Sequence, residues 1–165
     1  MTQKKKKSAV KGPAPSTKGK ARSVAEDSNP HPPQGTEGLD GALRALELAL
    51  DKKALEPILL DVRDLCSFCN YQLVVSGRSD RQVDAIADAI NVGLKHDGLR
   101  VIGSEGARTG QWALLDYGDF VVHVFLHAAR EHYDLEGLWN DAPRVPIDVP
   151  ADARIPAGEA YDAVS

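Results

Sequence analysis

The sequence predicts an α/β fold, a mixed five-stranded sheet with packed helices, in one domain that spans residues 39–142. Three observations predict it. Helical and strand periodicities alternate through this part of the chain. One strand–helix–strand unit is flanked by a hairpin, which combines parallel and antiparallel pairing. The flanking segments lack this regularity, so residues 1–38 are expected to be a disordered basic tail and residues 143–165 a flexible C-terminal tail.

The domain begins with an amphipathic helix. Asp40 can cap its N-terminus, and Pro57 is expected to end it, because proline cannot continue a helix. Its apolar positions recur at the spacing of one helix face, at Leu43, Leu46 and Leu50. Two short apolar strands follow, over residues 58–62 and 71–76, with a polar connection between them.

The second helix carries the clearest pattern in the chain. It follows a strand that Gly77 stops, and Ser79 and Gln82 form the Ser-x-x-Gln signature of a capping box. The apolar positions then recur at helical spacing, at Val83, Ile86, Ala87, Ile90 and Leu94. Gly98 is the expected C-terminal stop.

The second half of the domain contains three predicted strands and a final helix. The strands are expected over residues 100–103, 111–116 and 120–126. A Gly-rich turn region separates the first two, and Tyr117-Gly-Asp119 predicts a hairpin between the last two. The final helix is expected over residues 127–138, with a weak break at Gly137.

Charge is unevenly distributed along the chain. Residues 1–22 hold eight basic residues and no acidic one, whereas the rest holds the remaining 12 basic and all 24 acidic residues, a formal charge of −12. An acidic domain is repelled by nucleic acid phosphates and attracted to basic proteins. No apolar run reaches membrane length and no secretory signal follows Met1, so we expect a cytoplasmic protein.

The two cysteines, Cys66 and Cys69, form a CxxC motif in the connection between the first two strands. A redox-active CxxC pair normally opens a helix, and a zinc site needs four ligands, for which no second pair exists. We therefore favour two small, partly buried side chains, and we expect no metal and no cofactor. A redox role for the pair stays open.

Several polar residues have both a chemical and a structural interpretation. Gly77 and Ser79, between a strand and a helix, could hold a phosphate, but capping alone explains both. Asp116 and Asp119 could hold a metal, but tight turns favour the same residues. His123 lies inside a strand with no nucleophile signature beside it, so a hydrogen-bonded, buried histidine is expected.

Trp112 is the strongest candidate for a binding residue. It shares one face of its strand with Leu114 and Asp116, while Ala113 and Leu115 point the other way. If helices pack on only one face of the sheet, the other presents Trp and Leu to solvent, which marks a binding surface. The alternative is that the following helix covers this face, and periodicity does not decide between them.

The ordered set of residues in this domain resembles the iojap-type ribosomal silencing factors. The residues that carry the resemblance are Leu60-Asp-Val-Arg63, Ser67-Phe68, Gly77-Arg-Ser-Asp-Arg-Gln-Val83, Ile86-Ala-Asp88, Glu105-Gly106, Trp112, Leu115-Asp116, Gly118-Asp119, Val121-Val-His-Val124 and Tyr133-Asp-Leu-Glu-Gly-Leu-Trp139. The resemblance implies a nucleotidyltransferase-like fold without an active site. It also implies binding to the large ribosomal subunit through its fourteenth protein, which blocks joining of the small subunit and represses translation under nutrient limitation.

The resemblance also implies which residues bind this partner. Trp112 is associated with the contact in the family, with Leu114 and Asp116 beside it. The charged residues expected to orient partner groups are Asp119, Asp80 and Arg81. Because the domain is acidic and ribosomal proteins are basic, a protein–protein contact suits it better than an RNA contact. The Lys-rich tail is expected to make only a weak contact with ribosomal RNA.

Two other functions stay open. One is a nucleotide-binding or residual nucleotidyltransferase enzyme, with its site at Gly77, Ser79, Asp116 and Asp119. The other is a homodimer of the free protein, formed through the face that carries Trp112. Metal-dependent nucleotide binding would favour the enzyme, and co-sedimentation with free large subunits would favour the ribosomal function.

Overall fold

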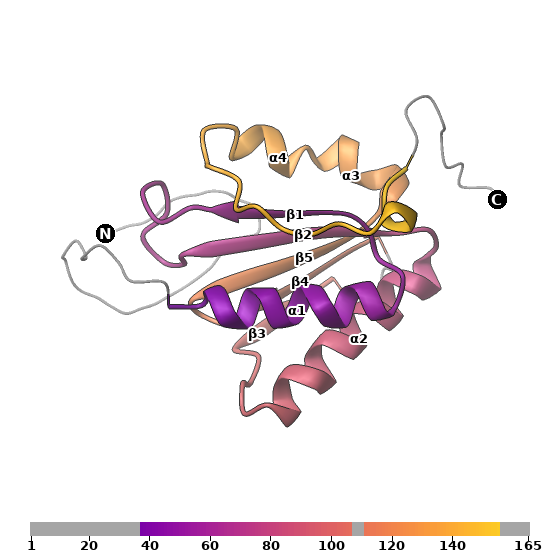
Figure 1. The fold of residues 1–165 in the computed structure, drawn as a ribbon, viewed down its shortest axis with the longest axis horizontal. Helices are drawn as coiled ribbons and strands as arrows, with labels where there is room; N and C mark the ends of the chain where they lie inside the picture. Colours follow the sequence, from indigo (N-terminus) through magenta and orange to yellow (C-terminus); the bar gives the residue numbers. More distant parts are fainter. Residues whose placement is uncertain (1–36, 107–110, 156–165) are drawn as a thin grey trace. The chain divides into compact units, whose positions relative to one another are not determined.

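The computed structural model describes residues 37–106 and 111–155, whose five strands form one mixed sheet (Figure 1). The strands are β1 (Leu55–Asp61), β2 (Tyr71–Gly77), β3 (Gly103–Glu105), β4 (Trp112–Asp116) and β5 (Phe120–Leu126). Their spatial order is β1-β2-β5-β4-β3. Strands β2 and β5 are parallel and the other neighbours are antiparallel. The predicted mixed five-stranded α/β class is confirmed.

Helices cover both faces of this sheet (Figure 1). The α-helices are α1 (Leu39–Asp51), α2 (Asp80–His96), α3 (His127–Tyr133) and α4 (Leu135–Leu138). Helices α1 and α2 pack on one face, where the largest core cluster of the described residues lies. Helices α3 and α4 lie over the other face, where Leu135 packs on Val74 of β2 and Phe125 of β5.

The start of α2 has the predicted cap. Ser79 Oγ accepts a hydrogen bond from the Gln82 backbone N–H at 3.1 Å. The Gln82 side chain does not return a bond to Ser79 in the described contacts. Its Oε1 accepts from the Arg78 backbone N–H at 2.6 Å, and its Nε2 donates to the carbonyl oxygens of Lys52 and Lys53 at 3.0 and 3.1 Å. Gln82 therefore ties the start of α2 to the turn between α1 and β1.

Helix α1 differs from the prediction at both ends. Its N-cap is Gly38, at φ 96°, while Asp40 lies in the first turn, where its charge suits the helix dipole. The helix ends at Asp51, and the chain reverses through Lys53 at φ 65°. Pro57 therefore does not end the helix. It lies inside β1, at one edge of the sheet, where a missing N–H is tolerated.

Two later boundaries also differ. The final helix breaks at Asp134, at φ 48°, rather than at Gly137. Asp134 then caps α4, because its Oδ1 accepts a hydrogen bond from the Gly137 backbone N–H at 3.2 Å. Strand β3 covers residues 103–105 instead of 100–103, since its pairing with β4 starts only where Gly103 lies opposite Asp116.

The segment after α4 lies along β1, which differs from the expected domain end at residue 142. Val145 N–H donates to Leu59 O, and Asp61 N–H donates to Pro143 O, both at 2.8 Å. Ala153, in a short 3₁₀ helix at Ala151–Ala153, is buried. Residues 143–155 thus pack on the domain, while the predicted tails over 1–36 and 156–165 lie outside the described residues. None of the described helices has the length and apolarity to span a membrane.

Candidate functional site

The face of the sheet opposite α1 and α2 carries the residues predicted from β4. Trp112, Leu114 and Asp116 share this face and are half-buried, while Ala113 and Leu115 are buried in the core under α1 and α2. The strand register places Trp112, Leu114 and Asp116 opposite three β5 residues, which are Phe125, His123 and Val121. The predicted alternation is therefore observed, and it places Trp112 and Leu114 next to each other on the face of the sheet over which α3 and α4 lie.

Helix α3 covers the Trp112 indole only in part. The indole stacks on the Phe125 ring at a centroid distance of 5.1 Å, and Tyr133, at the end of α3, contacts it at 4.7 Å. Tyr133 itself is 42% exposed, and Trp112 keeps an intermediate exposure. Both alternatives for this face are thus partly correct, because the helix touches the indole and leaves part of it accessible.

A chain of hydrogen bonds fixes the orientation of this indole. Trp112 Nε1–H donates to His123 Nδ1 at 3.2 Å. Because Nδ1 accepts, the neutral imidazole carries its proton on Nε2, which lies 3.1 Å from Gln72 Oε1. Burial lowers the pKa of His123 to about 3, so the ring is uncharged at neutral pH. His123 is therefore the hydrogen-bonded, buried histidine that the sequence predicts.

The loop between β1 and β2 covers the next part of this face. Cys66 and Cys69 are buried, and they pack in a small cluster against which Leu114 and Trp139 also lie. The two sulfur atoms are 3.5 Å apart, and Gln72 Nε2 donates to Cys69 Sγ at 3.9 Å. Among the described residues, no group of three or more His, Cys, Asp or Glu side chains is arranged to hold a metal ion.

Asp116 and Asp119 act in the hairpin turn between β4 and β5. Asp116 Oδ1 accepts a hydrogen bond from the Gly118 backbone N–H at 2.8 Å, the contact expected of an aspartate that starts a turn. Burial raises the pKa of Asp116. Asp119 is exposed, and its carbonyl oxygen accepts from the Asn70 N–H at 2.8 Å. The turn interpretation is supported by the side chain of Asp116, whereas the described contacts of Asp119 are made by its backbone.

The remaining predicted residues lie elsewhere. Asp80 and Arg81 are exposed at the start of α2, the helix that covers the opposite face, so the fold does not gather them with Trp112. Gly77 pairs with Leu126, five residues along β5 from the partner of Asp116. At about 3.3 Å per residue, this separates Gly77 from Asp116 by roughly 16 Å along the sheet. The proposed phosphate and carboxylate groups therefore do not form one site.

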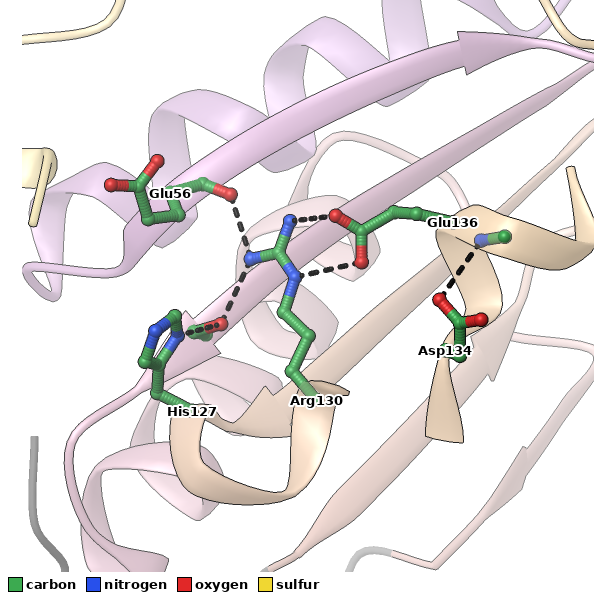
Figure 2. A network of polar contacts seen from close by, with 7 residues as sticks. Glu56, His127, Arg130, Asp134 and Glu136 are labelled. Atoms are coloured by element: carbon green, nitrogen blue, oxygen red, sulfur yellow. Dashed lines mark hydrogen bonds and ion pairs between the residues drawn. The ribbon is translucent and has the colours of Figure 1, made fainter. Parts of the chain in front are cut away.

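Sequence reasoning missed a buried arginine that holds α3 and α4 in place (Figure 2). Arg130 donates two hydrogen bonds to the Glu136 carboxylate, at 3.1 and 3.0 Å. Its Nη1 donates to the Glu56 carbonyl oxygen at 2.8 Å and to Ser76 Oγ at 2.9 Å. His127 Nδ1 lies 3.0 Å from the same Ser76 oxygen. The network thus joins both short helices to β1 and β2.

Comparison with known proteins links this fold to ribosome silencing. The family model described as "Ribosomal silencing factor during starvation" matches residues 36–164. The chain is 45% identical over 96 residues to the Ribosomal silencing factor RsfS of Chromobacterium violaceum, which covers 58% of this chain and 79% of that protein. It is 41% identical over 98 residues to the Ribosomal silencing factor RsfS of Bacillus subtilis, covering 59% and 83%.

A solved structure has the same fold. A crystal structure of a Chromobacterium violaceum protein superposes with a TM-score of 0.62 and 40% sequence identity. The match covers 70% of this chain and 96% of that one.

Proposed function

The chain belongs to the ribosomal silencing factor family, and from this premise we propose that it binds the large ribosomal subunit and blocks joining of the small subunit. Its partner there is the fourteenth protein of the large subunit, and the result is repression of translation when nutrients are limiting. One observation carries the proposal. Trp112 is half-buried, oriented by His123 and partly accessible on a sheet face that α3 covers incompletely.

The surroundings of Trp112 suit an anchor for a protein partner. Central aromatic side chains with limited freedom supply much of the binding energy at protein interfaces, and here the indole is already held by a hydrogen bond and two ring contacts. The two segments that pack on this face also carry exposed apolar side chains. These are Phe68, 71% exposed, in the loop and Leu138, 63% exposed, in α4. Apolar exposure of this kind supports protein binding.

Charge supports a basic partner. The chain after residue 22 carries a formal charge of −12, which favours encounter with basic ribosomal proteins over RNA. Trp112, Leu114 and Asp116 form the proposed contact. Asp119, Asp80 and Arg81 would need a second contact, because they lie in the hairpin turn and on the helix of the opposite face.

Binding to isolated ribosomal subunits tests the proposal. We expect the protein to co-sediment with free large subunits and not with joined ribosomes. Trp112→Ala should weaken binding by about 2–4 kcal/mol, the range for a central aromatic anchor. Val92→Ala is the matched control, since Val92 is 58% exposed on α2, over the opposite face. Undiminished binding by a folded Trp112→Ala protein would refute the role of this residue.

The enzyme alternative has less support. A nucleotide site would need Gly77 and Ser79 to act with Asp116 and Asp119, which lie near the other end of the sheet. Calorimetry with nucleotides and Mg²⁺ separates the two functions. Metal-dependent binding that is lost in Asp116→Ala would favour the enzyme over the ribosomal function.

A further inference from the structure

The two cysteines are placed for a reaction that the ribosomal function does not use. Their sulfur atoms are 3.5 Å apart in one short loop, and both thiols are free. A disulfide needs about 2.05 Å between the sulfurs, so the pair has to close by roughly 1.5 Å. Both cysteines lie in the loop between β1 and β2, so this movement breaks no strand pairing.

The environment makes the two thiols unequal. Burial acts to raise the pKa of the Cys66 thiol, but hydrogen bonds from the Cys69 thiol and from the backbone N–H groups of Phe68 and Cys69 outweigh it and lower that pKa. The pKa of Cys69 is raised, because its thiol donates to Cys66 and is buried. Since the thiolate is the reactive form, Cys66 is the nucleophile of the pair and Cys69 the resolving thiol.

The pair is connected to the proposed docking residue. Gln72 donates through Nε2 to Cys69 Sγ, and its Oε1 is the partner of His123. His123 in turn accepts from the Trp112 indole. Only two side chains therefore separate the sulfur from the indole. A change in the position of Cys69 Sγ alters the first link of this chain.

We propose that Cys66 and Cys69 form a reversible disulfide with hydrogen peroxide as the oxidant, and that its formation weakens docking through Trp112. The Cys66 thiolate attacks one peroxide oxygen, the O–O bond breaks, and hydroxide leaves as a sulfenic acid forms. Cys69 sulfur then attacks Cys66 sulfur, loses its proton and displaces the hydroxyl group as water. Two thiols and one peroxide give one disulfide and two waters, and a dithiol reverses the step by exchange.

The burial of the pair favours a small oxidant. Both cysteines keep only a small exposed fraction, while Ser67 and Phe68 between them are exposed. Peroxide reaches such sulfurs through opening of the loop more readily than a protein disulfide does. The effect on docking rests on the proposed function, whereas formation of the disulfide does not.

The disulfide itself is tested on the full chain without ribosomes. The protein is treated with peroxide, denatured, labelled with maleimide and weighed by mass spectrometry. We expect a mass two hydrogens lower than that of the reduced chain, no maleimide, and full labelling after dithiothreitol. In Cys69→Ser we expect a dimedone-reactive sulfenic acid at Cys66. Two maleimides on the peroxide-treated chain, or independent over-oxidation of each thiol, would overturn the proposal.

The connection to Trp112 has its own readouts. The Nε1–H nuclear magnetic resonance signal of Trp112, identified by its loss in Trp112→Phe, should shift on oxidation of the full chain and return on reduction, with no shift in Cys69→Ser. Oxidised protein should bind free large subunits roughly three- to tenfold more weakly, the effect of loosening one hydrogen bond. An unchanged signal with equal binding by both forms refutes the connection. Failure of the reduced protein to bind refutes the proposed function alone.

Discussion

Replacing Arg130 by Met is expected to destabilise the fold by about 3 kcal/mol. Arg130 is 6% exposed and lies at the centre of the polar network in Figure 2. Met replaces the aliphatic part of the arginine side chain and has no hydrogen-bond donor. The change therefore leaves the Glu136 carboxylate without its guanidinium, and it removes a donor from Ser76 Oγ and from the Glu56 carbonyl oxygen.

The magnitude follows from the burial of the two partners. Removing one partner of a fully buried ion pair costs about 3–5 kcal/mol. The Glu136 side chain keeps 27% exposure against 7% for Arg130, so water can solvate the remaining carboxylate and the lower end applies. Arg130→Met combined with Glu136→Gln removes that charge. The double variant should therefore lose about 1–2 kcal/mol less than the sum of the two single variants.

Urea unfolding followed by circular dichroism measures both values. The matched control is Arg44→Met. Arg44 forms an ion pair with Asp97 at 2.8 Å, and both side chains are more than a third exposed, at 43% and 35%. A solvent-exposed pair contributes little to stability, because water and salt screen its charges. Equal losses in Arg130→Met and Arg44→Met would show that burial does not set the strength of the Arg130 network, and would refute the reasoning.

Three further predictions concern stability and binding. Burial lowers the pKa of His123 to about 3, whereas the unfolded chain has a histidine pKa of about 6.5. As the pH falls from 6.5 to 3, the unfolding free energy should therefore decrease by up to about 1.4 kcal/mol per pH unit. His123→Gln should make this decrease smaller in urea titrations. Gly38→Ala should lower the unfolding free energy more than Gly98→Ala in the same assay. Both glycines have a positive φ, but a Cβ added at Gly38 would lie 2.7 Å from Asp119 Cβ, whereas one added at Gly98 meets no atom within 4 Å. Removing residues 1–36, which keeps the Gly38 cap of α1, should reduce the salt dependence of large-subunit binding, and an unchanged slope would exclude an RNA contact by this tail.

The sequence predicted the parts of the fold that local patterns determine. Strand alternation in β4 placed Trp112 and Leu114 on one face because side chains alternate with period two whatever lies beyond the strand. The Ser79 cap could also be predicted from local sequence, because its hydrogen bond joins residues only three positions apart. His123 was identified as buried because apolar residues flank it in β5.

Features that depend on packing between elements were not readable. Arg130 and Glu136 are six residues apart, outside the spacing at which helix side chains meet, and they pair only because the chain breaks at Asp134. The segment after residue 143 is rich in proline, which predicted a flexible tail, although its backbone forms hydrogen bonds with β1. Asp80 and Arg81 were grouped with Trp112 because periodicity does not say which face of a sheet a helix will cover.

The break at Asp134 connects the stability of the domain to its proposed docking surface. Helix α3 ends there with Tyr133 beside the Trp112 indole, and Leu135 of α4 packs on Val74 of β2 and Phe125 of β5, in a cluster that Trp112 also contacts. The residues of β4 on this face, Trp112, Leu114 and Asp116, stay half-buried and keep part of their surface exposed. Arg130 holds both helices in this arrangement, so Arg130→Met that remains folded should also bind large subunits more weakly. Arg44→Met should not, because Arg44 lies on α1, across the sheet from the indole.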